Sequence, residues 1–239
     1  MSNLKALNNH IKLCKQCRLH KTRKNAIIGE GPLPSRFMFI AQAPGRNEDR
    51  YNKILIGPSG DIFNTLLQSV NITRDHTYIT NLLKCFLPNC RKPRKDEIET
   101  CFGLHLVKEI EEVKPEIIIT LGYHVTKFIF KLYDLKVPNR IEFKSTFGKL
   151  FIAKNTKIVP LHHPATVVHK SKKIDVLKSE YNILRTLQSP CRFIPFCTKY
   201  LRYKKGLEPI NQVERFCYGN WIQCSYFQRY TKNEFLSSD

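Results

Sequence analysis

The sequence predicts an α/β fold of three layers, in which helices cover both faces of a central, mainly parallel sheet of four strands. Three observations predict it. Four short apolar runs rich in β-favouring residues lie in the first two thirds of the chain, helical periodicities lie between them, and the runs are almost continuously apolar. Strands with this continuous apolar character are typical of a sheet that is buried on both faces.

The four strands are expected where the apolar runs are rich in Ile, Val, Phe, Tyr and Thr and too short to form a typical helix. They are followed by a Gly, Pro, Asn or polar residue, which is the usual punctuation at the end of a strand. The expected strands cover residues 36–41, 77–81, 116–121 and 157–161.

The helices are expected where apolar residues recur with the 3.6-residue helical period. One such segment has apolar residues at positions 62, 63, 66, 67 and 70, and another at 174, 177, 181, 184 and 187. The expected helices cover residues 59–70, 95–113, 125–133 and 174–187. Alternation of strands and helices is the reason for expecting a parallel sheet.

The chain divides near residue 188 into two parts of different composition. Residues 1–187 contain all the expected strands and helices, and we expect them to form one domain. Residues 188–239 hold 11 of the 26 aromatic residues and four of the nine cysteines, so they are expected to form a separate Cys- and aromatic-rich extension.

The composition excludes several classes of protein. Of the 239 residues, 42% are hydrophobic and 25% are charged, which is typical of a globular protein and not of a disordered, collagen-like or coiled-coil chain. No apolar run approaches the roughly 18 residues that a membrane span requires. The N-terminus lacks the apolar stretch of a signal peptide. We therefore expect a cytoplasmic protein with no membrane partner.

The chain carries a formal net charge of +20 at pH 7. A strongly basic protein gathers polyanions because binding releases their counterions. Nucleic acid is the first expected partner, followed by anionic membranes and RNA-rich assemblies. The alternative is a lysine content that reflects only the bias of the genome.

Each of the four expected strands ends in or is followed by a polar or glycine-containing segment, and ligands of parallel sheets bind beyond the carboxyl ends of the strands. We therefore expect these segments to lie at one rim. They are Gln42-Ala43-Pro44-Gly45, Asn81, Gly122 and His162-His163-Pro164-Ala165.

Four cysteines of the first part have the spacing of a metal site. Cys14 and Cys17 form a C-x2-C pair, whereas Cys85 and Cys101 follow much later. Two thiolates on a tight turn and two distant ones can form a tetrahedral sulfur site for zinc or a [4Fe-4S] cluster. The alternative is four buried free cysteines.

The order of the motifs resembles the iron–sulfur uracil-DNA glycosylases of the family 4 type, over about residues 8–187. The motifs that carry the resemblance are C-x2-C-R-L (14–19), Gly29 and Gly31, A-Q-A-P-G-R-N-E-D (41–49), I-G-P-S-G (56–60), Y-I-T-N-L-L-K-C (78–85), P-N-C-R-K-P (88–93), Cys101, L-G (121–122) and H-H-P-A (162–165). The resemblance implies a DNA repair enzyme that hydrolyses the N-glycosidic bond of uracil and leaves an abasic site. It also implies a uracil-DNA glycosylase-like fold and a structural [4Fe-4S] cluster on Cys14, Cys17, Cys85 and Cys101.

The resemblance also implies roles for single residues. Asn81 matches the asparagine that reads the base, and His163 matches the histidine that donates to the leaving base, with His162 as its alternative. Backbone groups of residues 42–45, including Ala43 and Gly45, would line the pocket. Glu48 and Asp49 match an acidic pair that would orient water or the charged sugar, and their alternative role is to cap a helix.

Three positions depart from the family pattern. Gln42 stands where relatives usually have Glu, Leu55 where they have a Phe that stacks on the base, and Cys90 where they tend to have Asn. A neutral amide cannot act as a base, and leucine offers no aromatic face. The alternatives to uracil-DNA glycosylase activity are therefore a glycosylase of altered base specificity or low activity, and a non-catalytic DNA-binding relative.

The segment after the histidine motif combines apolar residues with cations. In the family this region probes the duplex where the base leaves it. Val167 and Val168 are the candidate wedge, and the candidate backbone contacts are His169, Lys170, Lys172 and Lys173. The alternative is an ordinary loop that leads into a helix. We expect a monomer that acts on uracil-containing DNA, single- or double-stranded.

The extension holds Cys191, Cys197, Cys217 and Cys224, whose spacing is looser than in common zinc ribbons. A second metal site, containing zinc, is one interpretation. The aromatic residues of the extension could instead form a small core packed on the main domain, or stack on single-stranded DNA with cations between them.

Overall fold

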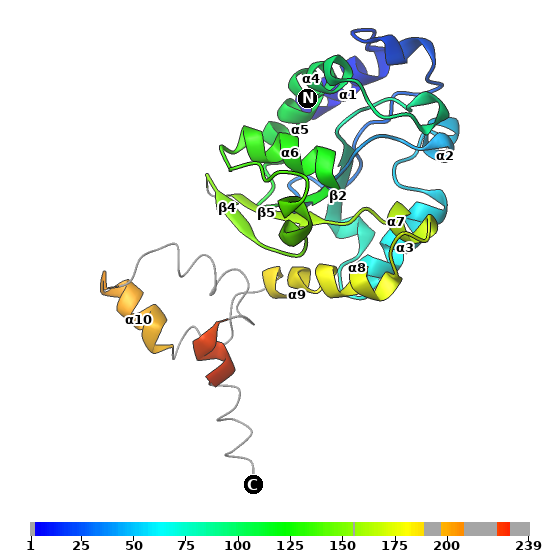
Figure 1. The fold of residues 1–239 in the computed structure, drawn as a ribbon. Coiled ribbons are helices and arrows are strands. Elements are labelled where there is room, and N and C mark those ends of the chain that lie inside the picture. The colour runs from blue at the N-terminus through cyan, green and yellow to red at the C-terminus, as the bar shows by residue number, and fades with distance from the viewer. Residues whose placement is uncertain (1–2, 155, 189–196, 208–223, 230–239) are drawn as a thin grey trace.

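The computed structural model describes residues 3–154, 156–188, 197–207 and 224–229. Its centre is a single five-stranded sheet of order β2-β1-β3-β5-β4 (Figure 1). The strands are β1 Phe37–Ala41, β2 Thr77–Asn81, β3 Ile117–Leu121, β4 Phe151–Ala153 and β5 Thr156–Leu161.

The sheet is parallel except at one edge, where β4 pairs with β5 in the antiparallel direction. The prediction of a mainly parallel α/β sheet is confirmed, but the prediction of four strands is wrong by one. The missed strand is β4, which has only three residues, all partly exposed. Three residues are too few to show either a buried apolar run or an alternating pattern.

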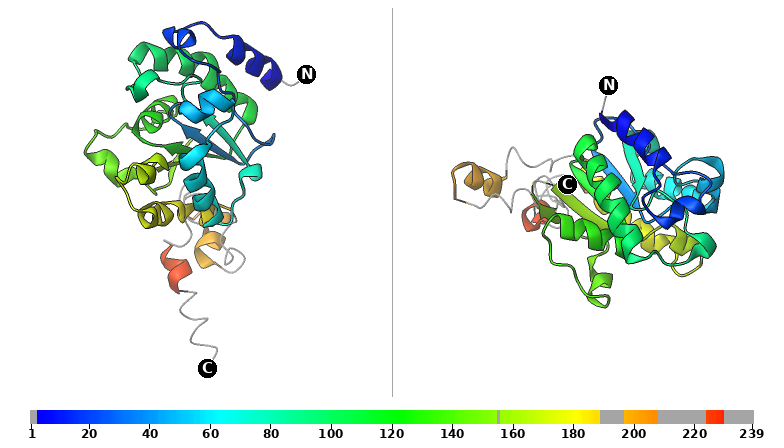
Figure 2. Two further views of the ribbon diagram at one scale, coloured as in Figure 1. Left: turned by 90° about the vertical axis from the view of Figure 1, so that its right-hand side faces the viewer. Right: turned by 90° about the horizontal axis from the view of Figure 1, so that it is seen from above.

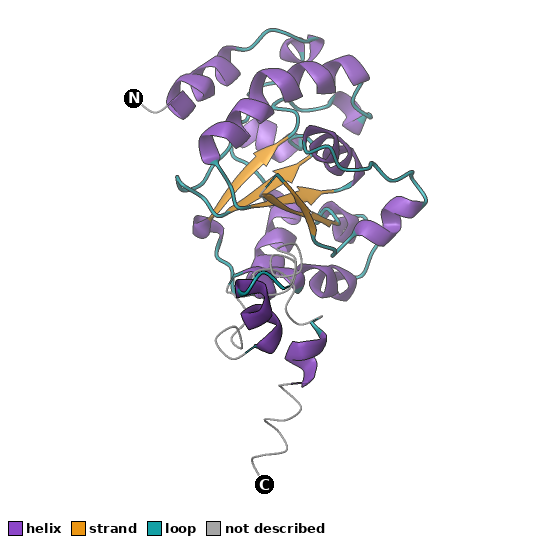
Figure 3. Ribbon diagram, turned by 90° about the vertical axis from the view of Figure 1, so that its left-hand side faces the viewer, coloured by secondary structure: helices purple, strands orange, loops and turns teal. Residues whose placement is uncertain are grey.

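Helices cover both faces of the sheet, as Figures 2 and 3 show. Side chains alternate between the two faces of a strand. In β1, Met38 and Ile40 pack into a core cluster that includes residues of α1, α5 and α6, while Phe37 and Phe39 pack into a second cluster with residues of α3, α8 and α9. The three-layer architecture follows from these two cores.

The helices of the described residues include most of the predicted ones and several that were not expected. Their bounds are α1 Asn3–Leu13, α2 Arg46–Tyr51, α3 Gly57–Gln68, α4 Lys95–Cys101, α5 Val107–Val113, α6 Tyr123–Leu132, α7 Ala165–Val168, α8 Ile174–Tyr181, α9 Ile183–Leu187 and α10 Thr198–Lys204. The helices α1, α2, α7 and α10 were not predicted.

The predicted helix over residues 95–113 is not a uniform α-helix. A π-helical segment, Phe102–Leu106, lies between α4 and α5 and begins directly after Cys101. Single π-turns inside helices are frequent at functional sites. The insertion therefore marks the neighbourhood of Cys101 as a place where the chain departs from regular geometry.

Among the described residues, no helix is both long enough and apolar enough to cross a bilayer.

Candidate active site and cysteine pocket

A cavity of about 480 Å³ lies at the carboxyl ends of the parallel strands. Parallel strands end at the same edge of a sheet, so the segments that follow them meet there. The residues that line the cavity come from the segments after β1, β2, β3 and β5, among them Gln42, Ala43, Pro44, Gly45, Asn81, Leu121, Gly122, His163 and Ala165. The structure thus brings together the rim segments that the sequence pointed to.

The segment after β1 is held against the segment after β2 by main-chain hydrogen bonds. The N–H of Leu82 donates to the carbonyl of Ala41 at 2.8 Å, and the N–H of Leu83 donates to the carbonyl of Gln42 at 3.0 Å. These bonds continue the strand pairing beyond the sheet. They place Gln42 beside Asn81, whose side chain is buried at 2% exposure.

His163 is fixed in one tautomer. The backbone N–H of Ala165 donates to Nδ1 of His163 at 3.0 Å, so the ring proton of the neutral imidazole lies on Nε2. Burial, with a smaller effect of the nearby His169, lowers the pKa of His163 to about 4. At neutral pH His163 is therefore an uncharged hydrogen-bond donor at the cavity wall.

His162 does not line the cavity. Its Nδ1 is 2.6 Å from Oε1 of Glu180, its backbone N–H donates to Oε2 of Glu180 at 3.1 Å, and its ring stacks on Phe147 with 3.6 Å between centroids. These contacts connect β5 to α8. Of the two neighbouring histidines, His163 is the one at the site.

The two acidic residues of the A-Q-A-P-G-R-N-E-D motif have different positions. Glu48 lines the cavity and is buried, and desolvation raises its pKa, against the effect of backbone hydrogen bonds that include Gly45 and Ile56. Asp49 is not among the lining residues. Its carboxylate accepts from the backbone N–H groups of Lys24 and Asn25 at 2.9–3.0 Å.

The Asp49 carboxylate thus binds the chain segment that precedes β1. Of the two carboxylates that were expected to orient water or the sugar, the structure favours Glu48, because both carboxylate oxygens of Asp49 accept from main-chain donors and Asp49 does not line the cavity. The role itself stays a prediction. Sequence spacing did not show which of the two neighbouring carboxylates would face the cavity.

Leu55 lines the cavity from a strained backbone position. Its φ of 48° lies in the left-handed region, which is costly for a branched side chain. Arg74 stabilises this conformation, because its guanidinium donates to the carbonyls of Leu55, at 3.1 Å, and Ile54. The absence of a side chain at Gly60 allows α3 to pack closely against the backbone of Leu55, since a Cβ there would lie 2.2 Å from the carbonyl oxygen of Leu55.

Phe86 and Arg91 are among the lining residues that the sequence analysis did not single out. Phe86, which is partly buried, lines the same cavity as Leu55 and follows Asn81 by five positions. Arg91 also lines the cavity, and its guanidinium donates to both carboxylate oxygens of Glu97 at 2.9 and 2.6 Å, which lowers the pKa of Glu97. The post-strand position of Phe86 was the available signal.

The residues after the histidine motif lie on α7 and the loop that follows it. Val168 is 38% exposed, whereas Val167 packs against the core cluster beneath α3 and α8. His169 lines the cavity, although it was predicted to contact the DNA backbone. The carbonyl of Thr166 accepts from the N–H groups of Ser171 and Lys172, which turns the loop. Lys170 and Lys172 are exposed.

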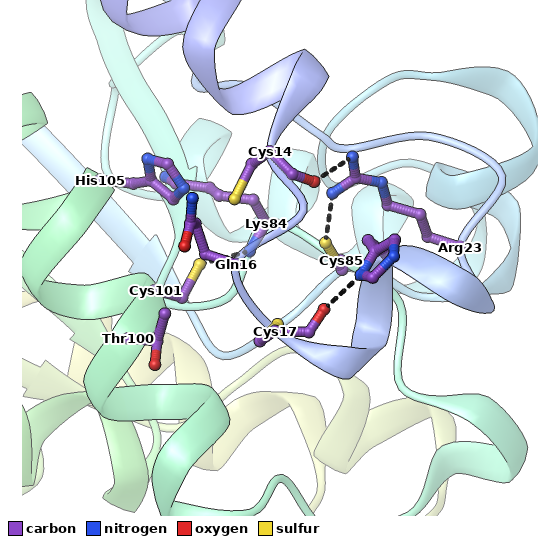
Figure 4. A pocket seen from close by; sticks show the side chains of 10 residues that line it. Cys14, Gln16, Cys17, Arg23, Lys84, Cys85, Thr100, Cys101 and His105 are labelled. Carbon is purple, nitrogen blue, oxygen red and sulfur yellow. Dashed lines mark hydrogen bonds between the residues drawn. The ribbon is translucent and has the colours of Figure 1, made fainter.

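Cys14, Cys17, Cys85 and Cys101 line a second, smaller pocket (Figure 4). Cys14 and Cys17 follow α1, Cys85 follows β2, and Cys101 ends α4. Cys85 and Cys101 are buried, while Cys14 and Cys17 are partly buried. Three segments that are distant in sequence therefore bring four sulfur atoms to one place.

The sulfur atoms have polar partners around the pocket. Nη1 of Arg23 donates to Sγ of Cys85 at 3.0 Å, and the backbone N–H of Lys84 lies 3.3 Å from Sγ of Cys101. Burial raises the pKa of the Cys17 and Cys85 thiols and raises that of Cys101 to about 12. Without a metal these thiols hold their protons at neutral pH.

Only two of the four cysteines of the extension lie among the described residues. Cys197 is buried at the start of α10 and Cys224 is partly buried, but Cys191 and Cys217 lie outside the described residues. The prediction of a second metal site on Cys191, Cys197, Cys217 and Cys224 therefore stays a prediction.

The family model of the uracil DNA glycosylase superfamily matches residues 28–186. The chain belongs to this superfamily. The match covers the whole sheet and the cavity residues Gln42, Asn81 and His163, whereas Cys14 and Cys17 precede it and the extension follows it.

Curated relatives in the uracil DNA glycosylase superfamily are similar over most of this chain. The chain is 34% identical over 185 residues to the type-4 uracil-DNA glycosylase of Archaeoglobus fulgidus, covering 76% of this chain and 91% of that protein. It is 36% identical to the Saccharolobus solfataricus enzyme of the same name, over 76% and 84% of the two chains. For the Sulfurisphaera tokodaii enzyme the identity is 32%, over 78% and 86%.

Proposed function

We propose that this member of the superfamily hydrolyses the N-glycosidic bond of uracil in DNA and leaves an abasic site. The observation that carries the proposal is that Asn81 and His163, from β2 and from the segment after β5, line one cavity at the sheet rim. The similarity to proteins named type-4 uracil-DNA glycosylases supports it.

The base has to leave the stack before it can reach such a cavity. Asn81 then reads its Watson–Crick edge, because an amide supplies one acceptor and two donors and can pair with the N3–H and O4 of uracil. A buried amide discriminates by hydrogen bonding, since an unmatched polar group in a closed cavity costs about 1–3 kcal/mol. Backbone groups of residues 42–45 shape the wall beside it.

The glycosidic bond breaks as its electron pair moves onto the base, which becomes an anion with charge on O2. His163 donates its Nε2–H to this oxygen. An uncharged donor is suitable, because a preorganised hydrogen bond stabilises charge that develops only in the transition state. Water adds its oxygen to the sugar carbon and loses a proton, which balances the departing base.

Among the described residues that line the cavity, Glu48 is the one with a carboxylate. The oxocarbenium-like sugar carries positive charge, and a nearby carboxylate stabilises it. We assign this role to Glu48. Gln42 cannot take it, since an amide carries no charge, but its carbonyl can align the attacking water.

A second candidate function is the removal of another altered base, or of uracil at a low rate. Gln42 and Leu55 favour it, because both line the cavity and both depart from the pattern of the family. A non-catalytic DNA-binding relative is the third candidate, and it would retain salt-sensitive DNA binding without product.

The proposed partner is DNA, single- or double-stranded, bound by a monomer. Val168 is the proposed wedge, because it is the more exposed valine of α7. Lys170 and Lys172 are positioned on the neighbouring loop to contact phosphates, which would give affinity without sequence preference. We place the activity in residues 1–187, in the cytoplasm on nucleoid DNA.

The cysteine pocket fits a [4Fe-4S] cluster. The sulfurs of Cys14, Cys17, Cys85 and Cys101 surround one space, yet no three metal-binding side chains of the described residues approach closely enough to hold a single ion. A cluster contains several atoms between its ligands, so its sulfurs stand farther apart than those of a zinc site. We propose these four residues as its ligands.

Such a cluster would connect the segment after α1 to the segment after β2 and to α4, and its binding energy would stabilise the fold. The extension remains a candidate for a zinc site on Cys191, Cys197, Cys217 and Cys224.

The deciding experiment is a product screen with cluster-loaded protein. Oligonucleotides that contain uracil, and parallel sets that contain another deaminated base, are incubated with the protein in single- and double-stranded form. Alkali then cleaves the strand at any abasic site. Strand cleavage at uracil supports the first function, and cleavage only at another base supports the second. No cleavage at any base, with DNA binding and iron content intact, would reject both.

A further inference from the structure

The cysteine pocket contains a cation whose guanidinium is bonded directly to sulfur. Arg23 is partly buried, and its Nη1 donates to Sγ of Cys85 at 3.0 Å. Its Nη2 donates to the carbonyl oxygens of Cys14, at 2.8 Å, and Lys12, at 3.1 Å. In Figure 4 the guanidinium end of Arg23 lies at one side of the pocket, with dashed lines to the carbonyl oxygen of Cys14 and to the sulfur of Cys85.

We propose that Arg23 is a positioning residue that sets the reduction potential of the cluster and protects it from oxidative loss. The inference rests on the proposed [4Fe-4S] site, and it concerns a side chain that is not itself a ligand.

Among the described residues that line the pocket, the other ammonium or guanidinium group is already paired with a carboxylate. Lys84 lines the pocket too, but its Nζ forms an ion pair with Glu109, with both side chains at most 2% exposed, and also donates to the hydroxyl of Thr80 at 2.6 Å. Within the described parts of the chain, the hydrogen-bond partners of Arg23 are a thiol and two carbonyls, and none is a carboxylate. Its positive charge is therefore available to the sulfur atoms.

A cluster bound by four thiolates carries net negative charge, and burying that charge is costly without a compensating partner. The reduction potential of such a cluster depends on its net charge and on hydrogen bonds to its sulfurs. At Cys85, Arg23 supplies a positive charge that offsets the net charge of the cluster and a hydrogen bond to the sulfur. Adding an electron makes the cluster more negative, so the guanidinium stabilises the reduced form more strongly and makes oxidation less favourable.

The forked shape of the guanidinium gives a second effect. One end binds the sulfur of Cys85 and the other binds the main chain at Cys14, so two ligand segments are held at a defined spacing. Lysine carries the same charge, but it has a single ammonium and lacks the planar fork. Arg23→Lys therefore separates the effect of charge from that of positioning.

The test compares the wild-type chain with Arg23→Gln and Arg23→Lys, each purified and reconstituted without oxygen. Arg18→Gln is the matched control, because Arg18 lies on the same segment and pairs with Asp96 at 3.1 Å instead of with a sulfur. Iron content, the midpoint potential from protein-film voltammetry and the rate of bleaching in air are measured for each.

For Arg23→Gln we expect a lower midpoint potential, with an about tenfold change in the redox equilibrium, which corresponds to about 59 mV for one electron. Bleaching in air should be about tenfold faster. Arg23→Lys should keep most of the potential but take up less iron, and Arg18→Gln should behave as the wild type.

The inference is overturned if clusters in Arg23→Gln show the wild-type potential and bleaching rate, since a merely structural residue would change only the amount of cluster. If Arg23→Gln takes up no iron, Arg23→Lys decides: because lysine keeps the charge, a midpoint potential about 59 mV or more below that of the wild type would overturn the charge argument. A wild-type chain without four irons would instead reject the cluster itself.

Discussion

The cavity at the sheet rim and the cysteine pocket are built in different ways. The cavity takes its polar side chains from the carboxyl ends of strands and from the segments just after them. The register of the sheet therefore brings Asn81, the last residue of β2, to the same rim as His163, which lies two residues after β5. The cysteine pocket is formed by segments outside the sheet, and Arg23 bridges two of them. The comparison indicates that the fold preorganises the cavity, whereas the cysteine pocket would depend on the proposed cluster to hold its segments together.

The largest expected effect is at the cavity. His163→Ala should lower the rate of uracil release by about 100- to 1000-fold, the usual cost of removing a donor to developing negative charge. Single-turnover kinetics with uracil-containing DNA measure it, and iron content should not change.

His162→Ala is the adjacent control. It removes the contact with Glu180 and should lower the melting temperature while leaving the rate of the folded protein within a few fold. Equal rates for the two histidine variants would contradict the assignment of His163.

The comparison predicts a different result at the cysteine pocket. Cys85→Ser should lower iron content and thermal stability together, because loss of a ligand removes binding energy that contributes to folding. Iron analysis and thermal unfolding measure the two quantities. Cys197→Ser changes a buried cysteine that lies outside this pocket, and it should leave the iron content unchanged if the second site is independent.

Glu48 is expected to set the acidic limit of activity. Burial raises its pKa above the usual 4.5, and its proposed role requires the charged form, so activity should fall as the pH drops through this raised value. His163 is not responsible for this limb, because its pKa of about 4 keeps it neutral over most of the range. The pH–rate profile of Glu48→Gln should lack the limb, and its persistence would reject the role.

Gln42→Glu should raise the rate on uracil by about tenfold, since a second carboxylate can stabilise the charged sugar or accept a proton from water. The measurement is the single-turnover rate on single- and double-stranded substrates. Gln42→Ala tests the remaining role of the amide, and a rate equal to the wild type would show that Gln42 does not align water.

Phe86→Leu should have the smallest effect. Phe86 supplies an aromatic ring to a cavity in which Leu55 has none, and an aromatic contact contributes about 0.5–1.5 kcal/mol beyond its area. We expect a several-fold weaker binding of DNA that contains uracil, with little change for undamaged DNA. The double variant Leu55→Phe/Phe86→Leu should recover binding if one ring is enough.

The sequence predicts the sheet well because its buried strands are continuous apolar runs. The predicted limits of the four parallel strands agree with the structure to within one residue. The strand β4 and the helix α7 were missed because three or four residues carry too little periodicity. The break between α8 and α9 was also not predicted, since the apolar spacing continues across it.

The candidate site could be predicted where a residue lies at or just beyond the carboxyl end of a strand, as Asn81 and His163 do. It could not be predicted where tertiary contacts decide the direction of a side chain. Asp49 turns to the main chain at Lys24, and Arg23 reaches Cys85 across 62 positions of sequence. Neither contact has a local signal in the chain.

Three residues separate Asn81 from Cys85, and the backbone N–H of Lys84 between them lies against the sulfur of Cys101. Because so few residues lie between the two, a change in the position of Cys85 would also move the side-chain amide of Asn81. If the proposed ligands hold iron, the accuracy with which uracil is distinguished from normal bases would then depend on the supply of iron in the cell.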